Sequence, residues 1–161
     1  MATIGFIGLG VMGEPMCRNA MSVAARLPLP GGERETIMIE RLPELVNGDA
    51  ALVRRGRFLS TTFLLGVGGD SWLIQVREGR IASVARAPAV MPTYSFALRA
   101  PAEAWRRFWE PVPPPGWQDL FALQRHKALV MEGDLQPLMA NLLYIKDVLA
   151  APRRLHGSAR P

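Results

Sequence analysis

The sequence predicts an α+β fold built on a mostly antiparallel sheet of five strands, preceded by a short β-turn-α fragment at the N-terminus. Four runs of residues alternate between apolar and polar side chains, which is the pattern of half-buried strands. Glycines separate the first three runs and supply the positive φ that tight hairpin turns require. A strongly periodic apolar pattern then predicts a long closing helix.

The N-terminal fragment comprises a short apolar strand at 3–7, a glycine-rich turn and a helix from Glu14. Residues 27–35 contain two prolines and two glycines, so we expect a linker there. We therefore divide the chain into a fragment with its linker at 1–30, a domain at 31–155 and a disordered tail at 156–161. Mixed helical spacing with Pro43 and Gly48 as interruptions predicts two short helices within 36–54.

The remaining elements follow from local signals, and the turns predict that consecutive strands pair antiparallel. Pro101 suits the first turn of a helix that ends at Pro111, and Asp134 suits the N-cap of the closing helix. The expected strands are 58–67, 72–77, 80–87, 93–100 and 126–132, and the expected helices are 101–109, 117–123 and 135–149.

Composition limits the class of protein. With 161 residues, 49% hydrophobic and 20% charged, the chain can bury a sizeable core in one domain. No apolar run approaches the ~18 residues of a membrane-spanning helix. The N-terminus lacks a basic segment, and Glu14 and Arg18 interrupt its apolar run, so we expect no secretory signal. The single cysteine, Cys17, cannot form an internal disulfide, which favours a cytoplasmic location.

Charge gives little functional information. The net charge of +5 is nearly all arginine, since Lys127 and Lys146 are the only lysines, and the arginines are scattered along the chain. We therefore predict no nucleic-acid surface. The only histidines are His126 and His156, and Cys17 has no histidine near it in sequence, so neither a metal site nor a histidine-based catalytic pair is expected.

The first residues carry a dinucleotide-binding motif. The stretch from Ile4 to Met16 closely resembles the start of 3-hydroxyisobutyrate dehydrogenases and their 6-phosphogluconate dehydrogenase relatives. The resemblance implies a Rossmann-like fragment in which Gly8, Gly10 and Gly13 approach the pyrophosphate of NAD or NADP. In this alternative interpretation, residues 36–40 form the second strand and Glu40 binds the ribose.

The rest of that family's pattern is missing. A dinucleotide fold continues as alternating strands and helices for well over 100 residues, whereas hairpin-linked strands begin here at Phe58. The family's Asp-Ala-Pro-Val-Ser-Gly-Gly substrate segment is absent, and Lys146 does not stand in the catalytic lysine pattern. We therefore predict no dehydrogenase activity and no cofactor, and interpret residues 1–20 as a truncated or fused remnant.

A second resemblance covers about three quarters of the chain. The order of elements over 36–155, with the junction Met131-Glu132-Gly133-Asp134 between the last strand and the closing helix, resembles the sterol carrier protein type 2 superfamily. It implies that helices cover one face of the five-stranded sheet. Because Ala159-Arg160-Pro161 is not a peroxisomal address and the Pro113-Pro114-Pro115 segment is atypical, we expect a bacterial subgroup.

This resemblance implies non-catalytic binding of a lipid or another hydrophobic small molecule in a cavity between sheet and helices. Aromatic and methionine side chains suit the walls of such a cavity, and burial of methylene groups drives the binding. For each single wall residue, a plain role in the core is the alternative interpretation. The candidate wall residues are Phe63, Trp72, Ile74, Tyr94, Phe96, Leu98, Trp105, Trp109, Phe121, Met131, Leu138, Met139 and Leu142.

Two other functions stay open. One is an NAD(P)-binding fragment of a dehydrogenase-like oxidoreductase, and the other is an accessory or interaction module whose cavity has collapsed. The segment from Trp105 to Trp109 also carries aromatic and basic residues that suit transient contact with an anionic membrane surface, although a helix with its aromatics in the core is the simpler interpretation. The oligomeric state is not predicted.

Overall fold

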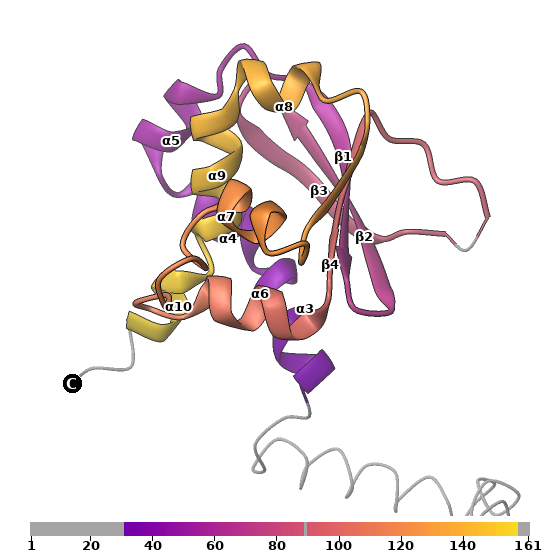
Figure 1. The fold of residues 1–161 in the computed structure, drawn as a ribbon. Coiled ribbons are helices and arrows are strands. Elements are labelled where there is room, and N and C mark those ends of the chain that lie inside the picture. Colours follow the sequence, from indigo (N-terminus) through magenta and orange to yellow (C-terminus); the bar gives the residue numbers. More distant parts are fainter. Residues whose placement is uncertain (1–30, 89, 158–161) are drawn as a thin grey trace, which may run out of the picture. The chain divides into compact units, whose positions relative to one another are not determined.

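A computed structural model of the chain describes residues 31–88 and 90–157, and the sheet and the helices from residue 42 onward belong to a unit that begins at Glu35 (Figure 1). The five strands pair in the order β3-β2-β1-β4-β5. The fold is therefore α+β with a mostly antiparallel sheet, as the sequence predicts. The strands, labelled as in Figure 1, are β1 (Thr61–Val67), β2 (Asp70–Arg77), β3 (Arg80–Arg86), β4 (Phe96–Ala100) and β5 (Val130–Gly133).

The two predicted hairpins are present. β1 pairs antiparallel with β2, and β2 pairs antiparallel with β3. Between β2 and β3, Glu78 and Gly79 have φ values of 50° and 76°, the left-handed conformation of both central residues in a type I′ turn. A Cβ on Gly79 would lie 2.3 Å from the carbonyl oxygen of Val53, so this position also needs glycine for space.

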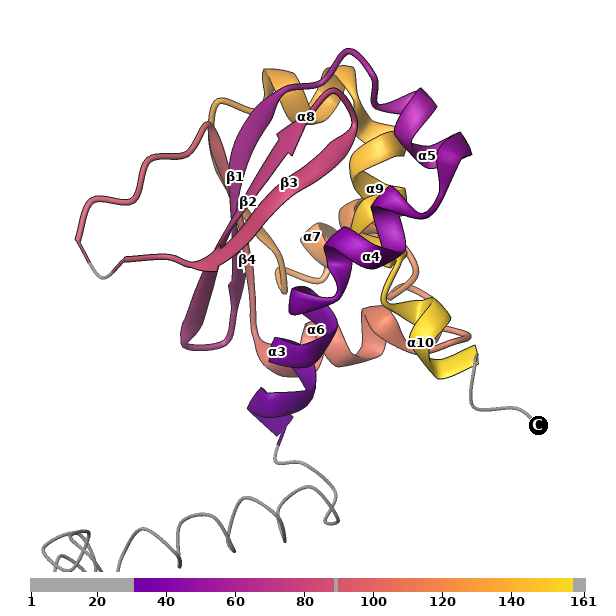
Figure 2. The same ribbon diagram turned by 180° about the vertical axis from the view of Figure 1, so that it is seen from behind.

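The fourth strand departs from the prediction in pairing and in length. β4 pairs parallel with β1 rather than antiparallel with β3, and it begins at Phe96, three residues later than expected. The connection of nine residues, 87 to 95, is long enough to carry the chain past β2 to the other side of β1. A two-residue turn is too short for this and can only join neighbouring antiparallel strands. Both views place this connection on the side of the sheet opposite the helices (Figures 1 and 2).

Helices cover the other face of the sheet (Figure 2). α6, which runs from Ala102 to Trp109, has the predicted aromatic face, with Trp105, Phe108 and Trp109 at most 1% exposed. The other helices are α3 (Gly31–Glu40), α4 (Leu42–Asn47), α5 (Ala50–Arg55), α7 (Leu120–Arg125), α8 (Gln136–Ala140), α9 (Leu142–Ala150) and α10 (Arg153–Gly157).

α4 also protects the exposed edge of the sheet. The side-chain amide of Asn47 donates a hydrogen bond to the carbonyl of Ile81 (3.0 Å) and accepts one from the amide of the same residue (2.9 Å). These two bonds imitate a neighbouring strand at the edge of β3. An edge strand whose backbone groups are paired in this way is a poorer template for aggregation.

The segment predicted as a linker is partly helical, because α3 begins at Gly31. Glu33 lies in its first turn, where a carboxylate interacts favourably with the helix dipole. The alternative interpretation of residues 36–40 as a second dinucleotide-fold strand is therefore wrong, and Glu40 is an exposed helical residue. Glu35, 3% exposed, forms an ion pair with the Arg106 guanidinium at 2.5 Å, which raises the pKa of that arginine.

The closing helix is divided in two at Asn141, which has non-helical dihedral angles of −123° and 33°. The Asn141 side chain donates to the carbonyl of Pro137 at 3.2 Å and so competes with the helical hydrogen bonds. Asp134 is not the N-cap residue, but its carboxylate accepts from the amide of Gln136 at 3.0 Å. β5 begins at Val130, not at residue 126 as predicted, because α7 and its turn occupy the preceding positions.

The predicted disordered tail begins in the structure as a helix, since α10 includes residues 156 and 157. Arg153 anchors this helix by donating to the carbonyl oxygens of Phe108 (2.6 Å) and Gln118 (3.1 Å). Its guanidinium also lies 4.4 Å from the centre of the Phe108 ring, within cation–π range. A basic residue just before the expected tail thus makes the contacts that order its first residues.

Candidate functional site

The candidate site is the apolar layer, by which we mean the buried side chains between the sheet and the helices. The rings of Phe63 on β1 and Phe96 on β4 stack with centres 5.2 Å apart. Trp105 stacks on Trp109 at 5.4 Å and meets Phe108 edge-on at 5.7 Å. The layer is therefore built on aromatic pairs from two parallel-paired strands and from α6.

Polar atoms of the layer's aromatics are bonded to the backbone. The indole nitrogen of Trp105 donates to the carbonyl of Gly66 at 2.9 Å, and that of Trp109 donates to Leu149 at 2.8 Å. The hydroxyl of Tyr144 donates to the carbonyl of Gly79 at 2.8 Å, and burial raises its pKa to about 12. These bonds fix the rings in place without leaving a donor unpaired in an apolar environment.

The structure brings most of the candidate wall residues together in one core. Met131 and Leu142 pack against it while partly exposed, and Tyr94 and Phe121 are half-buried. Met139 is 47% exposed, so the structure does not place it in the layer. Eight candidates are at most 3% exposed and belong to the core: Phe63, Trp72, Ile74, Phe96, Leu98, Trp105, Trp109 and Leu138.

Sequence reasoning missed Tyr144. It is 1% exposed, and its ring lies so close to Gly56 that a Cβ there would be 2.4 Å from it. A usable signal was its spacing of four residues from Val148 on the closing helix, which places both on one face.

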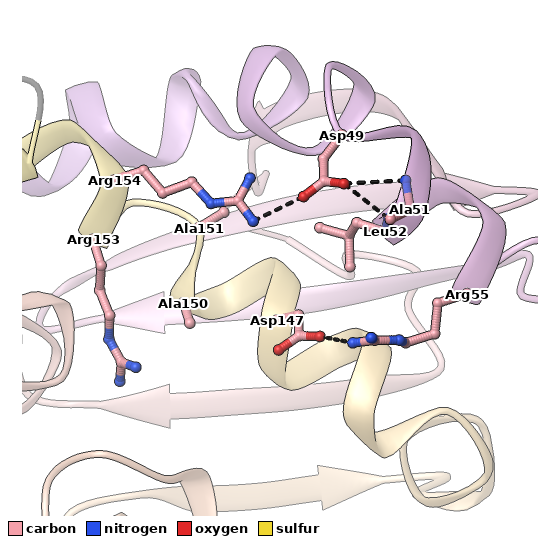
Figure 3. Close-up of a pocket in the computed structure, with 9 residues that line it drawn as sticks. All are labelled: Asp49, Ala51, Leu52, Arg55, Asp147, Ala150, Ala151, Arg153 and Arg154. Carbon is pink, nitrogen blue, oxygen red and sulfur yellow. Dashed lines mark hydrogen bonds and ion pairs between the residues drawn. The ribbon is translucent and has the colours of Figure 1, made fainter.

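The apolar layer reaches the surface at a depression between α5, α9 and α10, which we call the helical depression (Figure 3). Its volume is about 360 Å³. Leu52 and Ala151 line it, and both are core residues that are at most 4% exposed. Hydrocarbon at the base of this depression is therefore continuous with the layer.

Ion pairs surround the helical depression (Figure 3). Arg55 on α5 pairs with Asp147 on α9, and Arg154 on α10 pairs with Asp49 at 2.8 Å. Asp49 is the N-cap of α5, and the backbone hydrogen bond from Leu52, together with the Arg154 side chain, lowers its pKa. Both pairs join α5 to the C-terminal helices, so they hold the rim of the depression closed.

A second cleft, of about 420 Å³, lies on the opposite face of the sheet beneath the connection between β3 and β4. Leu64, Ser71, Arg86 and Arg99 contribute to its lining. It is thus distinct from the helical depression, and its lining combines the buried Leu64 and two prolines with one acidic and two basic side chains.

Other chemistry is sparse in the part of the chain that the structure describes. There, no three histidine, cysteine or acidic side chains gather as metal ligands would. His126 is the C-cap of α7 and stacks on Trp117 at 5.4 Å, rather than beginning a strand.

Among the residues that the structure describes, no helix is long and apolar enough to cross a bilayer. The aromatic residues of α6 are in the core and are not presented to a membrane surface.

Comparison with solved structures identifies the fold. A crystal structure of sterol carrier protein 2 matches with a TM-score of 0.59 and 12% identity over 73% of this chain and 94% of that one. A Thermus thermophilus protein described as a candidate sterol carrier protein matches with a TM-score of 0.54 and 11% identity, covering 72% of this chain and 86% of that one. The UbiJ-SCP2 ubiquinone synthesis protein matches with a TM-score of 0.51 and 19% identity, covering 80% of this chain and 97% of that one.

The domain thus has the sterol carrier protein 2 fold, as the second resemblance predicts. Residues 3–36 match the family model of the NAD binding domain of 6-phosphogluconate dehydrogenase, in agreement with the first resemblance. The glycines of that motif lie outside the residues that the structure describes. No curated protein sequence matches the chain.

Proposed function

We propose that this protein binds a lipid or another hydrophobic small molecule, without catalysis, in the apolar layer between its sheet and its helices. The observation that carries the proposal is the continuity of that layer with the helical depression through Leu52 and Ala151. The likeness to structures called sterol carrier proteins supports the same kind of ligand.

The helical depression is the proposed entrance. Access requires α5 to separate from α9 and α10, which breaks the pairs Arg55–Asp147 and Asp49–Arg154. All four side chains are at least 27% exposed, and exposed ion pairs contribute only about 0–1 kcal/mol each. Each methylene of an entering chain contributes about 0.8 kcal/mol on burial, so a long acyl chain offsets that loss several times over.

The wall of the site is proposed to be the eight buried candidates together with Met131 and Leu142. Met131 and Leu142 are partly exposed where they pack on the core, so they are positioned to move as a ligand enters. Methionine fits irregular apolar shapes because its side chain is flexible and unbranched. The charged rim of the depression would remain in water and contact any polar end of the ligand.

The proposal is tested by native mass spectrometry of the full chain and by displacement of a fluorescent fatty acid. We expect an apolar adduct and saturable binding. Arg55→Gln removes the pair that joins α5 to α9, and we expect it to raise both the association and the dissociation rate of the probe. Arg41→Gln is the matched control, because the Arg41–Glu44 pair is also exposed but does not line the depression.

If neither the wild type nor Arg55→Gln binds long-chain fatty acids or sterols, the carrier function is wrong and the collapsed interaction module is the better interpretation. Equal rates for Arg55→Gln and wild type, with binding retained, would instead show that the ligand enters elsewhere.

The match of residues 3–36 to an NAD binding domain favours one second candidate function, namely dinucleotide binding by the N-terminal fragment. Glu40 does not support it, because the residue lies in α3 rather than at the end of a strand. Addition of NAD or NADP at 100 times the dissociation constant would stabilise a binding protein by about 2.7 kcal/mol. We expect no such shift in melting temperature.

A further inference from the structure

Exposed apolar surface continues the helical depression toward the N-terminal end of α9. Leu143 is 66% exposed and lies four residues before Asp147, so both share one face of the helix. Because Asp147 pairs with Arg55 on α5, that face is turned toward α5 (Figure 3). Ala150, seven residues after Leu143, lines the depression from the same face. One strip of α9 therefore connects the depression with an exposed leucine.

The turn that follows α5 brings another exposed side chain to this end of α9. Gly56, the C-cap of α5, lies so close to Tyr144 that a Cβ would be 2.4 Å from the tyrosine ring. Phe58 follows two residues later, is 84% exposed, and has the Arg57 guanidinium 4.5 Å from its ring centre. Burial within the chain gives Phe58 and Leu143 little stability. By the α5–α9 surface we mean Phe58, Leu143 and the helical depression.

Basic groups outnumber acidic groups on this surface. Its two aspartates, Asp49 and Asp147, are already paired with arginines of the rim. Arg54 and Arg57 are exposed, one in the last turn of α5 and the other just after it, and neither forms an ion pair within the described part of the chain. The sequence contains no acidic residue between Asp49 and Asp70. The surface therefore favours a partner that brings its own carboxylates.

We propose that the α5–α9 surface binds an amphipathic helix of a partner protein, whose apolar face is flanked by acidic residues. Helices that bind in this way use apolar anchors at positions i, i+3, i+4 and i+7. Leu143 and Ala150 are about 10 Å apart along α9, the length of the same seven-residue spacing. A partner helix lying along α9 can thus place one anchor against Phe58 and Leu143 and another in the depression, with its carboxylates near Arg54 and Arg57.

Shape and charge favour a helix over a flat surface or a second copy of this chain. Leu52 and Ala151 line a hollow of about 360 Å³ and are at most 4% exposed, so a protruding side chain reaches them and a flat surface does not. A second copy would bring a net charge of +5 toward the same arginines, which is unfavourable. Binding at this surface does not require a ligand in the apolar layer, so the proposal stands apart from the carrier function.

The test begins with a selection of phage-displayed helical peptides on the purified full chain. The library has leucine fixed along one face of the helix and random residues at the positions that flank it. We expect aspartate and glutamate to be enriched at the flanking positions, because carboxylates there can pair with the arginines of the surface. Fluorescence anisotropy of a labelled selected peptide then gives its dissociation constant for the wild type and for each variant.

One pair of variants tests the apolar contacts. Phe58→Ser with Leu143→Ser removes both exposed side chains of the α5–α9 surface. Val90→Ser with Val112→Ser is the matched control, because those residues are 76% and 84% exposed but lie in the connections after β3 and α6. We expect the first variant to bind the peptide at least about tenfold more weakly and the control to bind as the wild type does. Thermal unfolding shows whether each variant is folded.

A second pair of variants tests the charges. Arg54→Gln with Arg57→Gln should weaken peptide binding and make it less dependent on salt. Arg41→Gln with Arg125→Gln is the control, because it changes the net charge equally at exposed arginines that do not line the depression. We expect this control to retain the wild-type dissociation constant.

The proposal is wrong if the selection enriches no peptide, if the enriched peptides lack acidic residues, or if a control loses as much affinity as its partner variant. Self-association of the chain, or flotation with phosphatidylglycerol vesicles, that Phe58→Ser with Leu143→Ser abolishes would assign the surface to a second copy or to a bilayer and would also overturn the proposal. A wild type that binds the peptide but no fatty acid or sterol would leave this proposal in place and refute only the carrier function.

Discussion

Replacing Leu98 by alanine measures whether the apolar layer is packed in the absence of a ligand. Leu98 lies in β4, is 0% exposed, and is in register with Leu65 on one side and Met131 on the other. The change removes three carbon atoms, worth about 2 kcal/mol in transfer free energy, and leaves a cavity. We therefore expect the free energy of unfolding to fall by about 2 to 5 kcal/mol, a large part of a typical domain's stability.

Urea unfolding of the ligand-free protein measures this loss. Leu73→Ala is the control, because Leu73 is half-buried between Trp72 and Ile74 and so faces the opposite side of the same sheet. We expect the control to lose less, about 1 kcal/mol. A loss below about 1 kcal/mol for Leu98→Ala would refute the reasoning, since it would mean that Leu98 already borders open space. Recovery of stability with a fatty acid would show that the new cavity lies in the ligand site.

Three further predictions follow from individual hydrogen bonds. Tyr144→Phe should destabilise the domain by about 1 kcal/mol. Because the folded pKa of Tyr144 is raised from 10.0 to about 12, the wild type, unlike the variant, should lose stability as pH rises through that interval. The pKa of Asp49 is lowered by the backbone hydrogen bond from Leu52 and by Arg154, so the ionised carboxylate stabilises the fold at neutral pH; the advantage of wild type over Asp49→Asn in melting temperature should disappear as pH falls below 3.8. Asn47→Ala removes both side-chain bonds to Ile81, and hydrogen exchange of the Ile81 amide should become faster.

Local signals predicted the hairpins well. Along β2, Trp72, Ile74 and Val76 are buried while the residues between them are half-buried, so burial has the period of two that a strand requires, although Leu73 interrupts the alternation in the sequence. Glycine at 68 and 79 has the positive φ that the turns require. Both signals act within a few residues, so they are independent of the rest of the fold.

Pairing between distant strands could not be predicted in the same way. The parallel register of Phe63 with Phe96 joins residues that are far apart in the chain, and no residue type in either strand specifies that partner. The break at Asn141 was visible only as a polar residue in a periodic apolar pattern. The Asn141 side chain interrupts the helix because it donates a hydrogen bond to the carbonyl of Pro137. Asparagine within a helical pattern makes such a bond to the backbone only in some contexts, so the break could not be predicted.

The rim of the helical depression was equally hidden. Arg55 and Asp147 are 92 positions apart, and Asp49 and Arg154 are 105 positions apart. Ion pairs between exposed groups leave no periodic pattern in a sequence, because any acidic residue can pair with any nearby arginine. The sequence therefore predicted eight of the side chains that are buried between sheet and helices, but not Tyr144 and not where the layer reaches the surface.

The bonding of the aromatic residues restricts what the layer can recognise. Trp105, Trp109 and Tyr144 each have one polar hydrogen, and backbone carbonyls at Gly66, Leu149 and Gly79 accept all three. A ligand carbonyl or carboxylate that entered the layer would therefore find these donors occupied and would lose its own hydration. A hydrocarbon group has no hydrogen bonds to water to lose on entering the layer. If the layer binds a hydrophobic ligand as we propose, affinity would then come from burial of apolar surface, and any selection among polar head groups would take place at the charged rim.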